Sequence, residues 1–126
     1  MIRRLGVAMG GLFLLGGLLG FIPGVIKDNM YLGIFMVNTA HNLLHIASGT
    51  FFLVAAMFSE TLTTWWFRIF GAFYAAMAIM GFVVGNGTIL GLISNNMYDA
   101  WGHAGLALIM LVIGFAASRR TNRLRV

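Results

Sequence analysis

Hydrophobic residues fill four long segments of the chain, and charged residues are confined to the boundaries between them. Lys, Arg, Asp and Glu are absent from residues 5–26, 29–59, 69–98 and 100–118. Each segment reaches or exceeds the roughly 18 to 20 apolar residues with which a helix crosses the hydrocarbon core of a bilayer. The pattern therefore predicts an all-α integral membrane protein, a four-transmembrane-helix bundle with helices at Leu5–Ile22, Asn38–Phe58, Trp65–Val84 and Asn96–Ser118.

The composition agrees with this class and excludes a soluble domain. Of the 126 residues, 60% are hydrophobic and 9% are charged, and the mean hydropathy is +0.93. Soluble domains usually carry about a quarter charged residues. We therefore expect a single membrane domain over residues 1–126, with the lipid bilayer as its first partner.

Basic residues indicate the orientation of the helices. Arg3 and Arg4 precede the first helix, Arg68 lies beside the middle loop, and four arginines follow the last helix in residues 119–126. Four crossings put these three regions on one side, which the positive-inside rule makes cytoplasmic. We expect a multi-pass protein of an inner (cytoplasmic-type) membrane, with both termini and a basic tail at 119–126 in the cytoplasm. This topology signal, which can also contact anionic lipid, explains the pI near 10.9 without a nucleic-acid partner.

Residues 5–58 and 65–118 share a pattern that predicts two parallel two-helix repeats. The matched positions are Gly20–Gly24 with Gly81–Gly85, Leu32-Gly33 with Leu90-Gly91, Asn38 with Asn96, and His45 with His103. Each hairpin crosses the membrane twice, so both copies run in the same direction and are related by an axis along the membrane normal. Such an axis would bring the second and fourth helices together, with His45 facing His103 and His41 facing Asp99.

The second and fourth predicted helices each begin with polar residues on one face. Positions i, i+3 and i+7 share a helix face, and they hold Asn38, His41 and His45 in one helix and Asn96, Asp99 and His103 in the other. The two asparagines are suited to cap the helix starts as supporting residues. Ionisable side chains inside a membrane are functional candidates by default, so His41, His45, Asp99 and His103 form the candidate site.

Two kinds of cofactor are compatible with this group. Three imidazoles and one carboxylate suit zinc, iron, copper or manganese, and the absence of cysteine excludes thiolate ligands. In the second case His45 and His103 bind haem b as axial ligands, or one of them binds the magnesium of a chlorophyll. A role in electron transfer or metal handling would follow, and the residue types leave the choice between a transition metal and a tetrapyrrole open.

A second interpretation needs no ligand. Histidines between membrane helices can serve as interhelical hydrogen-bond partners, and Asn or Asp suits the first turn of a helix. The protein would then be a non-catalytic accessory subunit of a larger membrane complex, or a homo-oligomer, in which the cluster only locks the bundle. An enzyme is less favoured, because the sequence has no glycine-rich phosphate loop and no paired carboxylates. The Ser48 hydroxyl beside His45 is expected to bond to its own helix.

The motif His41-Asn-Leu-Leu-His45 with Gly49, followed by Asp99-Ala-Trp-Gly-His103, resembles a bacterial family of small four-helix membrane proteins catalogued as a domain of unknown function (number 4383). The resemblance spans nearly the whole chain. Ala100 and Gly102 stand where the family pattern has Asn and Leu. The resemblance implies a four-helix membrane fold, and it implies no activity.

Overall fold

The computed structural model describes the backbone of residues 1–123 and the side chains of residues 1–117. Within this range it has four helices, α1 (Ile2–Leu19), α2 (Thr39–Phe58), α3 (Glu60–Val84) and α4 (Met97–Arg123). Each described helix is long and apolar enough to cross a membrane, so the predicted all-α membrane class is confirmed. The side chains of the predicted basic tail at 119–126 lie outside the described residues.

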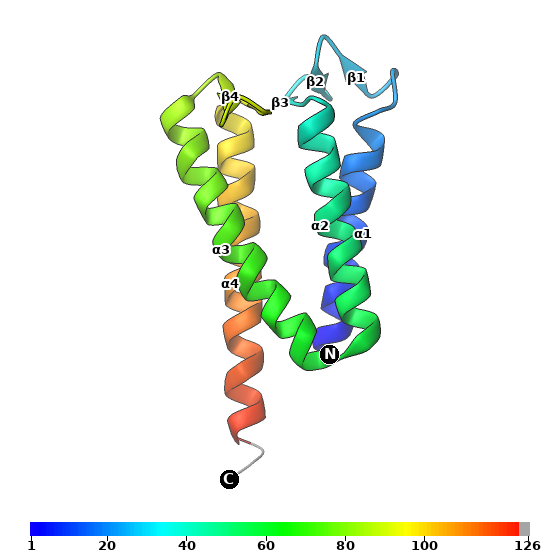
Figure 1. Ribbon diagram of the computed structural model, residues 1–126, viewed down its shortest axis with the longest axis vertical. Helices are drawn as coiled ribbons and strands as arrows, with labels where there is room; N and C mark the ends of the chain where they lie inside the picture. Colours follow the sequence, from blue (N-terminus) through cyan, green and yellow to red (C-terminus); the bar gives the residue numbers. More distant parts are fainter. Residues whose placement is uncertain (124–126) are drawn as a thin grey trace.

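The helices form two hairpins that stand side by side. Helix α1 packs along α2 in the first hairpin, and α3 packs along α4 in the second. Short β strands lie at one end of the molecule, here termed the connector end (Figure 1). The N-terminus and the end of α4 lie at the opposite end, termed the terminal end. All four helices thus run between the same two ends.

Ser59 alone joins the two hairpins, where a longer loop was predicted. The backbone N–H of Ser59 donates to the carbonyl of Ala55, which ends α2, and its hydroxyl oxygen accepts from the N–H of Leu62, 3.0 Å away. One residue therefore caps both helices. The prediction of a loop at 59–64 was wrong, because α3 begins at Glu60. Helix α4 also extends beyond the predicted end at Ser118.

The apolar connectors contain short antiparallel strands that the hydrophobic pattern does not predict. Strands β1 (Ile26–Lys27), β2 (Met30–Tyr31) and β3 (Phe35–Met36) form one sheet in that order, and β4 (Gly87–Ile89) pairs with β5 (Ile93–Asn95). The turns after β2 and β4 are alike. Leu32 and Leu90 both have φ of 53°, which is uncommon for a residue other than glycine. In both turns the next residue is a glycine, also with positive φ.

Hydrogen bonds between the two connectors are reciprocal. The Asn38 Nδ2 donates to the carbonyl of Leu92, and the Asn96 Nδ2 donates to the carbonyl of Ile34, both over 2.8 Å. In the predicted repeat Asn38 matches Asn96, and Ile34 and Leu92 each directly follow the matched Leu-Gly pair. Two copies related by a twofold axis exchange contacts in this way. These bonds support the parallel repeat, which stays a prediction.

Glycines bring the paired helices into backbone contact. A Cβ atom on Gly10 would lie 2.9 Å from the carbonyl oxygen of Gly49, and one on Gly49 would lie 2.7 Å from that of Gly10. In the second hairpin Gly71 packs against Leu111, as Gly10 packs against Leu53 in the first. Membrane helices gain packing energy through such close approach, because lipid supplies no hydrophobic drive between them.

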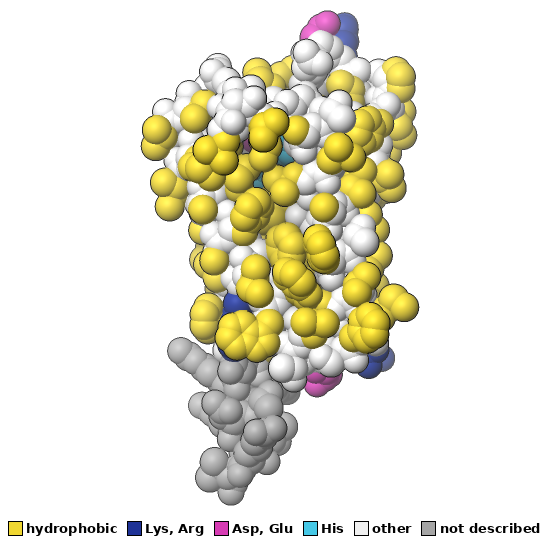
Figure 2. All heavy atoms as spheres, in the orientation of Figure 1, with side chains coloured by type: hydrophobic (Ala, Val, Ile, Leu, Met, Phe, Trp, Pro, Cys, Tyr) yellow, Lys and Arg dark blue, Asp and Glu magenta, His cyan; other side chains and the backbone are white. Residues whose placement is uncertain are grey.

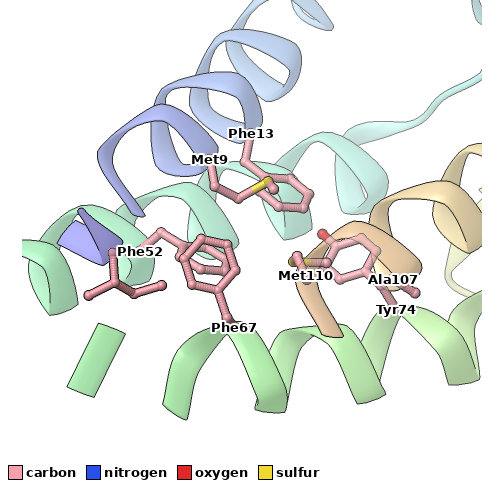
Figure 3. Close-up of a cluster of buried hydrophobic side chains, with 8 residues drawn as sticks. Met9, Phe13, Phe52, Phe67, Tyr74, Ala107 and Met110 are labelled. Atoms are coloured by element: carbon pink, nitrogen blue, oxygen red, sulfur yellow. The ribbon is translucent and has the colours of Figure 1, made fainter. Parts of the chain in front are cut away.

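The hairpins meet around an aromatic core (Figure 3). Phe13 of α1 stacks on Phe52 of α2 at a centroid distance of 6.2 Å and lies 5.0 Å from Tyr74 of α3. Phe52 in turn lies 4.8 Å from Phe67. The described core consists of Ile2, Met9, Phe13, Phe52, Phe67, Tyr74, Ala107 and Met110. Phe13 and Tyr74 also contact the histidines, so the core supports the site.

Candidate metal centre

All three histidines of the chain lie near the connector end of the bundle. His41 and His45 lie in the first two turns of α2, and His103 lies in α4. Asn38 caps α2 by accepting the N–H of His41, and Asn96 caps α4 by accepting the N–H of Asp99, each over 2.9 Å. At 1.5 Å per residue, His45 and His103 each lie about 9 Å beyond the first helical residue.

The three imidazoles converge into one cluster. One ring nitrogen from each histidine lies within 4.8 Å of the other two. The ring centroids are separated by 4.9 Å for His41 and His45, 5.4 Å for His41 and His103, and 6.0 Å for His45 and His103. His41 and His103 are buried. The prediction that His45 lies close to His103 is confirmed. The predicted packing of the second helix on the fourth is not seen among the described residues, because the hairpins meet mainly through α2 and α3.

Hydrogen bonds fix the tautomer of His41. Its Nδ1 lies 3.1 Å from the carbonyl oxygen of Met36 and 3.0 Å from that of Ser94. Because both neighbours are acceptors, Nδ1 carries the proton and Nε2 keeps a free lone pair. Histidines that bind metals commonly donate their second N–H to a backbone carbonyl in this manner, which orients the ring. His41 therefore has a free lone pair on Nε2 that could bind a metal ion.

His45 and His103 each present a buried nitrogen without a protein partner. Among the described residues, His45 Nε2 and His103 Nδ1 have no hydrogen-bond partner. Buried polar atoms in proteins are nearly always paired, since an unpaired one costs about 1–3 kcal/mol of desolvation. Two such nitrogens beside the oriented His41 form a donor set suited to a transition-metal ion.

Asp99 lines the site with the histidines and has a structural role beside the ligand role predicted for it. Its Oδ2 accepts the N–H of Asn96 at 2.9 Å, and it accepts the N–H of Met36 at 3.0 Å. The first bond closes a reciprocal cap at the start of α4, and the second fastens the connector of the first hairpin. Asp99 lines the same cavity as the histidines, so its part as a metal ligand stays a prediction.

Tyr74 and Phe13 belong to the site although the polar stripe did not include them. Tyr74 lies 5.3 Å from His103, and Phe13 lies 5.4 Å from His45, with the ring pairs close to edge-on. The Ser48 hydroxyl donates to the carbonyl of Leu44 at 2.8 Å. The Tyr74 hydroxyl, 2.9 Å away, therefore donates to Ser48. The expected bond of Ser48 to its own helix is confirmed.

A cavity of about 290 Å³ adjoins the cluster. Its walls come from α1, α2, α4 and the first connector, and most of its lining side chains are apolar. Figure 2 shows histidine atoms in a recess between the two hairpins, surrounded by hydrophobic side chains. The lining residues are Leu12, Phe13, Gly16, Tyr31, Phe35, Val37, His41, Asn42, His45, Asp99, Gly102, His103 and Leu106.

Fold and site together define a multi-pass membrane protein with a largely buried histidine cluster at one end of a four-helix bundle. The chain belongs to the family described as Domain of unknown function (DUF4383), whose family model matches residues 3–116. The resemblance seen in the two histidine motifs is thereby confirmed. No match was found among curated proteins or among solved structures.

Proposed function

We propose that the protein binds one first-row transition-metal ion, such as zinc, through His41, His45 and His103. The observation that carries this proposal is the convergence of the three ring nitrogens within 4.8 Å. Zinc–nitrogen bonds are about 2.0–2.1 Å long, so small side-chain rotations bring all three nitrogens into one coordination shell. Three protein ligands leave a fourth position for Asp99 or for an exogenous ligand.

The geometry supports a small ion better than a haem held between His45 and His103. Two axial ligands bind haem iron from opposite faces of a flat macrocycle, which needs an open slot between the rings. Here the third imidazole, His41, lies 4.9 Å from His45 and 5.4 Å from His103. The adjoining cavity of about 290 Å³ is also at the lower end of the roughly 300–1,000 Å³ of ligand pockets.

We further propose that the connector end, and with it the metal centre, faces away from the cytoplasm in an inner membrane. Arg3 and Arg68 support this orientation, because both lie toward the terminal end. Arg3 donates to the carbonyls of Ala56 and Met57 at the end of α2. The Arg68 Nε donates to the carbonyl of Gly114 at 3.0 Å. Basic residues are retained on the cytoplasmic side, and a centre on the opposite side would handle metal from the external medium.

The metal content of the purified protein tests the proposal. After zinc loading and washing, we expect one zinc ion per wild-type chain, and each of His41→Ala, His45→Ala and His103→Ala should weaken binding by at least about a hundredfold. Leu43→Ala is the matched control, since Leu43 lies on the same helix and is 53% exposed. The zinc affinity of Asp99→Asn tells whether the carboxylate is the fourth ligand.

Two results would contradict the proposal. A folded protein that retains no metal and shows no visible absorption would favour the alternative function, an accessory subunit whose polar cluster only locks the bundle. The reciprocal hydrogen bonds of Asn38 and Asn96 support this alternative function, because they join the hairpins without a metal. A Soret band that is lost in His45→Ala or His103→Ala would establish a tetrapyrrole instead.

A further inference from the structure

The cavity beside the histidines combines a polar base with apolar walls. His45 and His103 line it, and each has a buried ring nitrogen without a hydrogen-bond partner among the described residues. Aromatic side chains supply much of the wall, namely Phe13 from α1 and Tyr31 and Phe35 from the first connector. Aromatic rings prefer edge-on or offset contact with another ring. The cavity is therefore suited to a molecule with a flat ring and one polar atom.

The side walls of the cavity lie on segments that cross the membrane. Leu12 and Gly16 come from α1, and Gly102 and Leu106 come from α4. These two helices belong to different hairpins, and Leu12 is 57% exposed. Figure 2 shows that histidine atoms are visible from the side of the bundle, along a direction that lipid occupies in a membrane. The cavity is therefore open toward the side that the bilayer would cover.

Small residues set the width of this opening. A Cβ atom on Gly16 would lie 3.7 Å from His45 Nδ1, and one on Gly102 would lie 3.6 Å from Phe35 Cε1. Both are ordinary van der Waals distances, so the backbone tolerates a side chain at either position. A larger side chain would extend into the cavity and cover the histidines.

We propose that this cavity admits the head group of a lipid-soluble phenol or hydroquinone, whose oxygen takes the fourth position on the metal. The inference rests on the proposed metal centre. A divalent ion held by three neutral imidazoles keeps its full charge in an apolar setting, which favours an oxygen donor as the fourth ligand. The volume of about 290 Å³ holds a single-ring head group, while an alkyl tail remains in the bilayer.

Cobalt(II) in place of zinc provides the test, because its visible bands respond to the fourth ligand. The full chain is loaded with cobalt in lipid nanodiscs and titrated with 2-decylhydroquinone. We expect a saturable change of the cobalt bands. Decylbenzene, which lacks the oxygen, should cause no change, and hydroquinone without a tail should need at least about tenfold more ligand.

Paired glycine variants test whether the ligand enters the cavity between α1 and α4. Gly16→Leu and Gly102→Leu should raise the half-saturating concentration of 2-decylhydroquinone at least about tenfold. Gly11→Leu and Gly105→Leu are the matched controls on the same helices, because a Cβ at either position meets nothing within 4 Å. All four variants should retain cobalt as the wild type does.

Each failure has a distinct meaning. If the wild type retains no cobalt, the metal centre and the ligand proposal are both overturned. If cobalt is retained but 2-decylhydroquinone leaves its bands unchanged, the ligand proposal alone is overturned. Equal titration curves for Gly16→Leu and Gly11→Leu would also overturn it, because the ligand would then not pass beside α1.

Discussion

Tyr74 joins the two hairpins through a single buried hydroxyl. In Tyr74→Phe the hydrogen bond to Ser48 is lost while the ring keeps its contacts with Phe13 and His103. Ser48 still donates to Leu44, so we expect a loss of only about 0.5–1.5 kcal/mol in the free energy of unfolding. Zinc affinity should stay within about threefold, because the phenol is not a ligand.

Thermal unfolding in detergent and zinc titration measure the two effects of Tyr74→Phe. Tyr98→Phe is the control, since Tyr98 is 64% exposed. A large loss of zinc affinity in Tyr74→Phe alone would make the phenol oxygen part of the coordination shell, which would contradict the ligand set proposed here.

The sequence predicted the histidines because two polar stripes stand out in apolar helices. It did not predict Tyr74 or Phe13, which have no such contrast with their neighbours. Their positions are nevertheless matched in the repeat, since Phe13 precedes Gly20 by the same interval as Tyr74 precedes Gly81. Extending the repeat through the first helix of each hairpin would have identified both. The backbone carbonyls that orient His41 have no sequence signal.

Close packing of α1 on α2 depends on individual glycines. A Cβ atom on Gly17 would lie 2.7 Å from the carbonyl oxygen of Asn42 and 2.9 Å from the backbone nitrogen of Ile46. Because backbone atoms cannot move aside, Gly17→Ala should force the helices apart and destabilise the protein by about 1–3 kcal/mol.

Gly11→Ala is the matched control for Gly17→Ala. A Cβ atom on Gly11 meets nothing within 4 Å, so this change should be neutral or stabilise the helix by up to about 1 kcal/mol. Denaturation curves of the two variants under identical detergent conditions make the comparison. Equal stability would show that the first hairpin does not depend on backbone contact at Gly17.

Hydrophobic segment length predicted the helices and misplaced some of their ends. Segment length indicates where the chain is apolar, whereas the helix ends depend on local caps. Ser59 is such a cap, and α3 begins directly after it, where a six-residue loop was predicted. The connector strands are two or three residues long, too short to show an alternating pattern. Their turns have positive φ at Leu32 and Leu90, which residue preference alone does not indicate.

The orientation of the whole molecule is open to a direct test, because the chain has no cysteine. Asp28→Cys places a single thiol at the connector end, and Thr61→Cys places one at the terminal end; both native residues are exposed. Under the positive-inside rule, a membrane-impermeant maleimide added to intact cells should label Asp28→Cys. It should label Thr61→Cys only after lysis. The reverse pattern would put the histidine cluster on the cytoplasmic side.

At the scale of the molecule, the sequence predicted two hairpins and a shared polar site, and the geometry between them needed the structure. The repeat placed His45 opposite His103 and His41 opposite Asp99. In the structure His41 also turns toward His103, while the Asp99 carboxylate caps α4 and holds the first connector. His41 and Asp99 have these separate roles because of the hydrogen bonds that Met36 and Ser94 make where the two connectors meet.

X-ray absorption at the zinc edge tests the central claim most directly. For the zinc-loaded wild-type protein we predict three imidazole nitrogens at about 2.0–2.1 Å from the metal, with one further light-atom ligand. A zinc shell that contains only oxygen, with no imidazole scattering, would contradict the account.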